Sequence, residues 1–179
     1  MKTFFLLVTI LCSLTITAQK KILTKTASIS FEGSVDSFEP VQAENKNVTV
    51  VMDEQGNLAA LALMRGFKFP IALMEEHFNE NYMESDQYPK AVLRGTIVNF
   101  TSIPQDGIAH NVELKGNLEM HGVKRAVTVP IRITRSGDTY GITATFDILP
   151  RHYDIAIPSV VRNKIAESIK VTVKANLSE

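Results

Sequence analysis

The sequence predicts an all-β protein built as an antiparallel barrel of about eight strands. The main observation is that apolar and polar residues alternate with a period of two in four segments between residues 112 and 175. Successive side chains of a strand point to opposite faces, so each of these segments has one face that must be buried. Few helices are predicted that could cover this face, and a sheet curled onto itself buries it without a further element.

Each of the four clearest segments contributes four apolar side chains to the face predicted to be buried. These are Val112, Leu114, Leu118 and Met120; Val127, Val129, Ile131 and Ile133; Ile142, Ala144, Phe146 and Ile148; and Ile169, Val171, Val173 and Ala175. Weaker strand patterns cover residues 27–33, 47–52, 58–65 and 91–100, and turn signals lie at residues 53–57, 121–124 and 136–138. Together they give eight strands, several of them joined by short turns.

A short capping helix is predicted near residues 71–79, between two of the strands. Ile71, Met74 and Phe78 have helical spacing, and two glutamates lie in the first turn, where the helix dipole favours acidic side chains. The position of this helix in the chain suits a cap over one open end of the barrel. A second, shorter helical turn is predicted at residues 159–164.

Residues 1–18 have the pattern of a secretory signal peptide, which leaves one barrel domain at residues 19–179. Lys2 precedes an apolar run at residues 4–14, and this run is shorter than the roughly 20 residues that span a bilayer. We therefore expect export to the periplasm or beyond the cell, with no integral membrane segment after cleavage. Cleavage also removes Cys12, the only cysteine, so neither disulfides nor thiol chemistry are expected.

The charge balance gives no reason to expect a nucleic-acid partner. Without Lys2, 18 basic residues remain against 19 acidic ones, so the mature chain has a net charge near minus one. Its densest basic spots are two isolated dipeptides, far short of the basic stripe typical of nucleic-acid binding.

No familiar catalytic constellation occurs, so we predict a protein that is not an enzyme and has no catalytic residue, metal site or cofactor. The sequence lacks a Gly-x-Ser-x-Gly elbow, a His-Glu-x-x-His helix and a phosphate-binding glycine loop. His110 and Glu113 have the spacing of a ligand pair only in a helix, because residues three apart on a strand point to opposite faces. His121 and Gly122 are interpreted as a tight turn, since glycine readily adopts a positive backbone dihedral.

His77, on the predicted helix, has two interpretations. It could contact the polar head group of a ligand at the barrel mouth, together with Asn81. Alternatively, it forms a hydrogen bond that fixes the helix to a strand, and this structural role is favoured.

Two stretches of the chain resemble the YceI-like family. In residues 75–89 an acidic-His-aromatic stretch leads to a Tyr-Pro before a strand, and residues 116–125 contain a Leu-x-x-His-Gly-Val hairpin. Residues 77–82 and 154–158 are similar to those of variants common in secreted Bacteroidetes proteins. The resemblance extends over nearly the whole mature chain.

The resemblance implies an exported, lipocalin-like antiparallel barrel, with family members that bind a long isoprenoid or a similar lipid inside and share no catalytic reaction. The first strand departs from the family pattern, because many members have an Asp-x-x-His-Ser opening where this chain has Thr-Lys-Thr-Ala-Ser at residues 24–28. The chain also has few aromatic residues and no Trp. We therefore expect a pocket shaped differently from that of aromatic-rich relatives.

On this basis the chain is predicted to sequester or carry an isoprenoid-like or fatty lipid in an apolar barrel interior. The apolar residues predicted to line this interior are Met74, Phe78, Tyr82, Val112, Leu114, Leu118, Val129, Ile131, Ile142, Phe146, Val171 and Val173. Gly116 and Ala144 are small residues at inward positions and are interpreted as leaving room for the lipid, although either would also suit a bulge or a tight corner.

Two other functions stay open at this point. A filled barrel would act through its outer surface, as an envelope stress or interaction protein without a ligand. An enzyme acting on a small apolar substrate would use His77 as acid or base. A closed barrel has no free edge that compels dimerisation, but a homodimer paired over the barrel mouths is compatible with the pattern.

Overall fold

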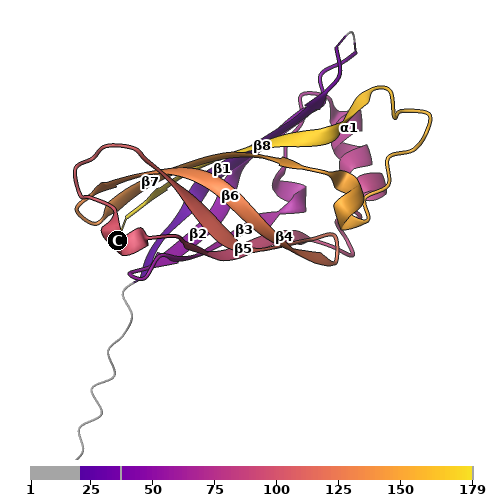
Figure 1. Cartoon of the computed structure of the whole chain (residues 1–179). Helices are drawn as coiled ribbons and strands as arrows, with labels where there is room; N and C mark the ends of the chain where they lie inside the picture. The colour runs from indigo at the N-terminus through magenta and orange to yellow at the C-terminus, as the bar shows by residue number, and fades with distance from the viewer. Residues whose placement is uncertain (1–20, 37, 179) are drawn as a thin grey trace, which may run out of the picture.

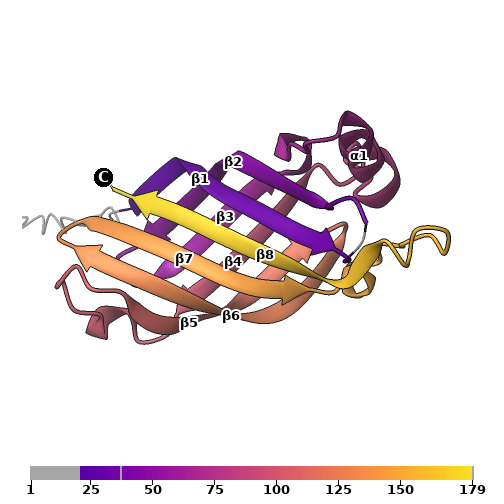
Figure 2. The ribbon, with the colours of Figure 1, turned by 90° about the horizontal axis from the view of Figure 1, so that it is seen from above.

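The computed structural model describes residues 21–36 and 38–178 and confirms the predicted fold: a closed antiparallel barrel of eight strands in sequence order, with a short helix (Figures 1 and 2). The predicted signal peptide lies outside the described residues. The strands are β1 (Lys21–Ser34), β2 (Gln42–Asp53), β3 (Asn57–Leu63), β4 (Lys90–Ile97), β5 (His110–Met120), β6 (Val123–Ser136), β7 (Thr139–Ile148) and β8 (Ile165–Leu177).

The barrel closes where β8 pairs with β1, as Figure 2 shows from above. In this ladder Val173 lies opposite Ile29, and Val171 lies opposite Phe31. All four of these side chains are on the interior face, so the alternation predicted for β8 continues across the closing pair. Closure pairs the first and last strands and leaves no sheet edge between them.

Three tight hairpins occur where turn signals were predicted. The loop between β2 and β3 contains Gly56 with φ 80°, and the loop between β6 and β7 contains Gly137 with φ 58°. The loop between β5 and β6 consists of His121 and Gly122, with φ values of 51° and 74°. Two successive residues with positive φ match the right-handed twist of the flanking strands, which explains the short connection.

The helical segment lies between β3 and β4, over one end of the barrel (Figure 1). The α-helix α1 (Ala72–His77) continues directly into the π-helix η2 (Phe78–Tyr82). Three 3-10 turns complete the helical elements of the described chain: η1 (Met64–Gly66), η3 (Phe100–Ser102) and η4 (Pro150–Tyr153).

The helical turn predicted at residues 159–164 is wrong. This segment is a series of turns, in which the Val161 N–H donates to the Pro158 carbonyl at 3.1 Å and the Lys164 N–H donates to the Val161 carbonyl at 2.8 Å. Isolated short helices are marginal unless an apolar face packs against the protein. Here Val160 is 80% exposed, so this part of the segment gains no such packing.

The two ends of the barrel differ in their connections and their filling. The end that carries the β2–β3 and β6–β7 hairpins, here called the packed end, is filled by side chains. Its fully buried members include Met52, Ile97, Ile133 and Leu177, and Phe100 stacks on Tyr140 with ring centroids 5.6 Å apart. The opposite end, which carries α1, is called the open end. No helix in the described part of the chain is long and apolar enough to cross a membrane.

Candidate ligand-binding cavity

A cavity of about 480 Å³ leads from the open end into the barrel. This volume lies within the roughly 300–1,000 Å³ of typical ligand pockets. All eight strands contribute to its wall, together with α1, η2 and the loops around the mouth. The lining residues from the strands are Ile29, Phe31, Val50, Leu58, Ala60, Ala62, Ala91, Leu93, Leu114, Leu118, Met120, Val129, Ile131, Ile142, Ala144, Phe146, Ile148, Ile165, Ile169, Val171, Val173 and Ala175.

Alanines provide much of the free space. Ala60 and Ala62 lie on β3, Ala144 on β7 and Ala175 on β8, and all four line the cavity. Each has only a methyl group, whereas most other lining positions on the strands carry larger apolar side chains, so the wall recedes at these points. Ala144 therefore lies at an inward position beside free volume, as the alternation predicts.

Gly116 is small for a different reason, which is the close approach of two neighbouring strands. It lies opposite Gly95 in the β4–β5 ladder, and a methyl group added to Gly116 would lie only 2.1 Å from the Arg94 carbonyl oxygen. Gly116 is not part of the cavity wall. The interpretation that Gly116 leaves room for a ligand is therefore wrong: the residue is small because two strand backbones approach closely there.

Four phenylalanines from separate segments form one wall near the open end. Phe31 of β1, Phe67 and Phe69 of the segment after η1, and Phe78 of η2 have ring centroids 5.1–5.8 Å apart in their five contacting pairs. All four line the cavity. The few aromatic residues noted in the sequence are thus concentrated at the site, where they add rigid apolar surface.

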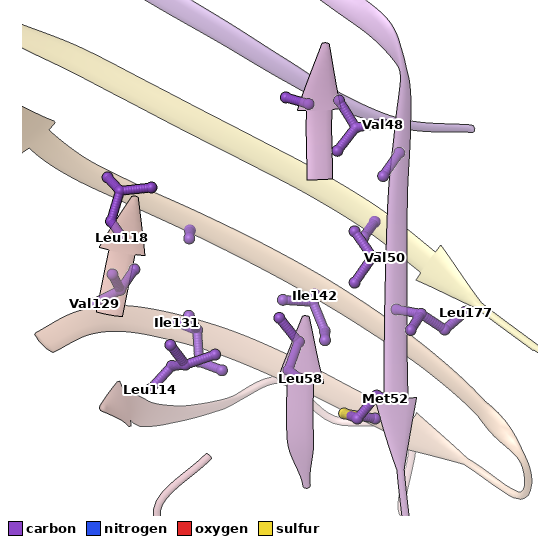
Figure 3. Close-up of a cluster of buried hydrophobic side chains, with 14 of the residues drawn as sticks. Val48, Val50, Met52, Leu58, Leu114, Leu118, Val129, Ile131, Ile142 and Leu177 are labelled. Carbon is purple, nitrogen blue, oxygen red and sulfur yellow. The ribbon is translucent and has the colours of Figure 1, made fainter. Parts of the chain in front are cut away.

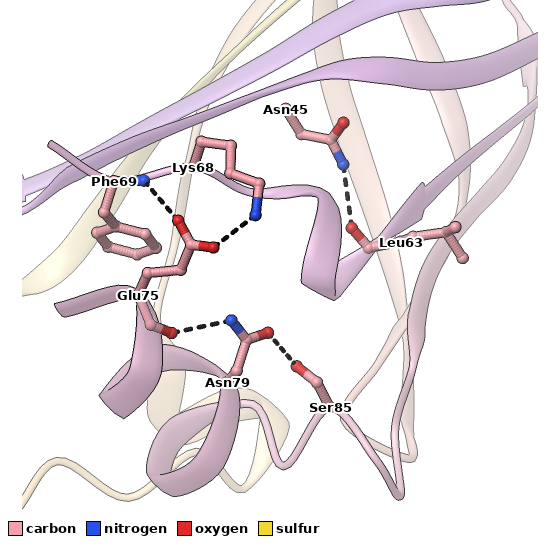
Figure 4. Close-up of polar contacts among 7 residues, drawn as sticks. All are labelled: Asn45, Leu63, Lys68, Phe69, Glu75, Asn79 and Ser85. Atoms are coloured by element: carbon pink, nitrogen blue, oxygen red, sulfur yellow. Dashed lines mark hydrogen bonds and ion pairs between the residues drawn. The ribbon is translucent and has the colours of Figure 1, made fainter. Parts of the chain in front are cut away.

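Glu75 fixes the helical cap, which consists of α1 and η2, to Lys68 and Phe69 in the segment between η1 and α1 (Figure 4). Its carboxylate pairs with the Lys68 ammonium at 2.5 Å and accepts a hydrogen bond from the Phe69 N–H at 3.3 Å. The Lys68 hydrogen bond, supported by the Phe69 N–H, holds the pKa of Glu75 below its ordinary value, although partial burial acts in the opposite direction. The cap is thereby linked to the segment that carries two of the four phenylalanines.

A second polar chain ties the end of the cap to the loop before β4. The Asn79 side-chain amide donates to the Glu75 carbonyl at 2.8 Å, and the Asn79 side-chain oxygen accepts from the Ser85 hydroxyl at 2.8 Å (Figure 4). Nearby, the buried Asn45 side chain donates to the Leu63 carbonyl at 3.0 Å. Ser85 is 2% exposed and Asn45 is 1% exposed, so these are satisfied buried groups that fix local geometry.

The polar groups of the cavity lie at its mouth. Glu39, His77 and Lys164 line it there, and the Lys164 ammonium lies 5.9 Å from the centre of the Phe38 ring. His77 is exposed, and its side chain makes no hydrogen bond or ion pair with another described residue. The structure therefore does not show the predicted hydrogen bond from His77 that would fix the helix to a strand. Instead, the imidazole faces the mouth of the cavity. Burial raises the pKa of the Tyr82 hydroxyl, which lies in the same wall.

His121 has a structural role that the sequence analysis missed. The residue is 9% exposed, and its ring Nδ1 lies 2.9 Å from the Tyr153 carbonyl oxygen and its Nε2 3.0 Å from a Glu84 carboxylate oxygen. The ring also packs on Tyr88 with centroids 4.5 Å apart. The turn interpretation is correct for the backbone, but the side chain joins three segments of the open end. Only one feature of the sequence pointed to this side-chain role: a histidine occupies a turn position at which Asn is more common.

Most of the residues predicted to line the interior lie in the cavity wall. Those that do are Met74, Phe78, Tyr82, Leu114, Leu118, Val129, Ile131, Ile142, Phe146, Val171 and Val173. Val112 lies outside the wall because it belongs to the packed end, and Asn81 is exposed and not part of the wall. That the lining residues contact a ligand stays a prediction.

The lining residues of β1 to β4 were not identified from the sequence. In β1 the pairing register shifts between Thr24 and Ala27 and again between Ala27 and Ile29, so the period of two is interrupted. The strands predicted in this half were correspondingly shorter than β1 and β2 are.

Other titratable groups do not come together as a reactive site. His110 pairs with Asp106 at 3.1 Å, and Glu113 pairs with Lys115 at 3.5 Å, so the His110–Glu113 spacing brings no ligand pair together, as expected for a strand. Within residues 21–36 and 38–178, no group of three or more His, Cys, Asp or Glu side chains could hold a metal ion.

Comparison with known proteins identifies similarity to one family. A family model described as a YceI-like domain matches residues 15–177. The search of curated proteins gave no match. Among solved structures, the chain is similar to a polyisoprenoid binding domain from Saccharophagus degradans implicated in plant cell wall breakdown, at 13% identity and a TM-score of 0.77, with 90% of this chain and 99% of that one covered.

Two further structures have the same fold. BcnA from Burkholderia cenocepacia is 16% identical with a TM-score of 0.68, covering 86% of this chain and 96% of that one. A YceI protein from Campylobacter jejuni is 14% identical with a TM-score of 0.51, and both chains are covered in full. At these identities the likeness concerns the fold alone.

Proposed function

Since this chain belongs to the YceI-like domain family, we propose that it binds an isoprenoid-like or fatty lipid inside its barrel and so sequesters or carries it. The observation that supports this most directly is the apolar cavity of about 480 Å³ that opens at one end of the barrel. The similar domain from Saccharophagus degradans is described as binding polyisoprenoids. Its fold likeness suggests which ligand class to test first.

The wall of the cavity suits an apolar tail. Each methylene moved from water into such a wall contributes about 0.8 kcal/mol, so a long tail binds well with few polar contacts. Among the lining residues, Glu39, His77 and Lys164 have acidic or basic side chains, and all three lie at the mouth. This distribution supports a ligand with an apolar tail inside and a polar head group at the mouth, in contact with His77.

The cavity favours this function over the two others considered. A barrel acting only through its outer surface would be expected to have a filled interior, whereas here the interior holds a continuous space. For catalysis, His77 would need a partner to hold one tautomer, and its ring makes no hydrogen bond within the described chain. Contact with a head group requires no such partner.

The proposal includes export. The apolar segment at residues 4–14 and the Thr-Ile-Thr-Ala stretch after it support a cleaved signal peptide. In the periplasm or outside the cell, a carrier of this kind would shield the apolar tail of a lipid from water.

The test is to extract purified protein with organic solvent and to identify any lipid by mass spectrometry. Ala60→Phe places a ring in the cavity, since Ala60 lines it, whereas Ala59→Phe places the same ring on the opposite face of β3. We expect lipid from the wild type and from Ala59→Phe, and much less from Ala60→Phe. Absence of lipid from the wild type, together with no binding of prenyl or acyl probes, would overturn the proposal.

A further inference from the structure

We infer that the cavity is a length-limited site, which holds one apolar tail of about 15 to 20 carbon atoms and ends at a closed floor. The inference rests on the proposed function, because it concerns which lipids fit. It narrows the ligand to fatty acyl chains and short isoprenoids and leaves the tail of a much longer isoprenoid only partly enclosed. The residues that form the floor would then decide specificity.

The floor is visible as a boundary that crosses five strands. Going from the open end to the packed end, the last lining residue on each of these strands is Val50 of β2, Leu114 of β5, Ile131 of β6, Ile142 of β7 and Ala175 of β8. Two positions further along each strand, on the same face, lie Met52, Val112, Ile133, Tyr140 and Leu177, and none of these lines the cavity. The cavity therefore ends at a common level of the barrel.

The region below this boundary has no room for a tail to continue. Met52, Ile133 and Leu177 are each 0% exposed, and Tyr140, opposite Leu177 in the β7–β8 ladder, stacks on Phe100 in the same layer. Figure 3 shows Ile142 and Leu58 directed toward one another, with Met52 and Leu177 nearby. Close-packed side chains of this kind do not separate without a loss of packing energy, so the floor is a firm stop.

The volume above the floor sets the length of the tail. A dry protein cavity of about 150 Å³ holds benzene, which corresponds to about 25 Å³ for each carbon atom. On this scale the 480 Å³ cavity holds about 19 carbons, and about 15 if part of the space at the mouth is left to the head group. A tail of 40 or more carbons would exceed this capacity at least about twofold.

This geometry predicts a break in the dependence of affinity on chain length. Below the limit, each added methylene is buried and tightens binding about fourfold, the equivalent of about 0.8 kcal/mol. Above it, added methylenes leave through the mouth into water and add nothing. Affinity should therefore rise steeply with length and then become flat.

The experiment measures binding of straight-chain fatty acids from C10 to C24, and in parallel of prenyl alcohols from C10 to C45, by displacement of 11-(dansylamino)undecanoic acid. For the wild type we expect a break between about C15 and C20 in both series. A continued rise through C24, or prenyl alcohols of C40 and longer binding severalfold more tightly than those of C20, would overturn the length limit while the proposed function stands. No binding of any member of either series would instead overturn the proposed function.

Variants of β7 test whether the lining sets the limit. Ala144→Leu adds three carbons of side chain inside the cavity and should move the break to chains about three carbons shorter. Thr143→Leu, on the exposed outer face of the same strand, should leave the break unchanged. Ile142→Ala removes three carbons from the floor and should move the break in the opposite direction. A break that stays in place in both Ala144→Leu and Ile142→Ala would overturn the assignment.

Discussion

The same eight strands build a solid core at one end of the barrel and a hollow at the other. At the packed end, large side chains such as Ile133 and Leu177 are completely buried, and the Phe100–Tyr140 stack closes the interior. At the open end, alanines such as Ala62 replace bulk, and the apolar side chains face free space. The strand pattern is alike in both regions, so alternation alone does not determine whether a barrel is filled.

The two ends also differ in what holds them together. The packed end depends on apolar contact and on tight hairpins. The open end depends on polar links, because its helical cap cannot bury a large apolar face against an empty space. Glu75 and Asn79 fix the cap, and His121 joins the β5–β6 hairpin to η4 and to the loop before β4. Stability is thus concentrated at one end, and ligand access at the other.

The largest expected effect comes from shortening an isoleucine at the packed end. Ile133→Ala should lower the free energy of unfolding by about 2–5 kcal/mol, because the lost side chain leaves a cavity in a fully packed region. The measurement is urea denaturation of the unliganded protein. Ile148→Ala, at a half-buried lining position of the open end, is the control and should cost less than about 2 kcal/mol, since Ile148 already lacks neighbours on one side. Equal losses would mean that the open end is packed in solution.

A methyl group at Gly116 should give the next largest effect. Gly116→Ala brings a Cβ to 2.1 Å from the Arg94 carbonyl oxygen, and backbone cannot move aside as a flexible side chain can. We expect a loss near the upper end of about 1–3 kcal/mol, measured by urea denaturation. In Gly137→Ala, the added methyl group would meet no atom within 4 Å, so only the cost of its φ of 58° should appear, about 1 kcal/mol. If Gly116→Ala is the milder of the two, the β4–β5 backbones are not closely apposed.

The two small residues singled out in the sequence show what sequence alone can decide. Gly116 and Ala144 both lie on inward faces of regular strands, and the pattern gives them the same interpretation. Gly116 is small because another backbone is close, and Ala144 is small beside free space. The distinction depends on the neighbouring strand, which the local sequence does not specify.

The fold itself was predictable because alternation, turn residues and the helical break near residues 71–79 all agreed on one architecture. The lining of β5 to β8 followed from the same alternation. The lining of β1 to β4 did not follow from it, and in β1 the reason is visible, because bulges near Ala27 interrupt the period of two. The four-phenylalanine wall was also hidden, because Phe31 is more than thirty residues from the others in the sequence.

Removing the His121 ring tests the polar links of the open end. His121→Asn keeps a residue that tolerates positive φ but loses the contacts to Tyr153 and Glu84, and should cost about 1–3 kcal/mol in urea denaturation. His110→Asn is the matched control, because His110 forms only a surface pair with Asp106, and should cost less than about 1 kcal/mol. Similar losses in the two variants would show that the His121 contacts are not stabilising.

The smallest effect concerns the pH dependence of the cap. The folded pKa of Glu75 is below its ordinary value, so the stabilisation that the carboxylate gives is complete above that ordinary value and is lost as the pH falls through the folded pKa. The expected contribution is below about 1 kcal/mol, because the Lys68 partner is exposed.

The Phe69 amide provides a local readout, since its N–H donates to the Glu75 carboxylate. Its proton chemical shift, followed by NMR, should titrate with a midpoint below the ordinary range of a glutamate. Lys68→Met removes the strongest cause of the lowered pKa, so the midpoint should rise, and Glu75→Gln should abolish the titration. A wild-type midpoint at or above the ordinary value, or one that Lys68→Met leaves in place, would mean that the cap is not held by this pair. The helical cap would then owe its position to the phenylalanine wall and to the Asn79–Ser85 hydrogen bond, and acid would not loosen it through Glu75.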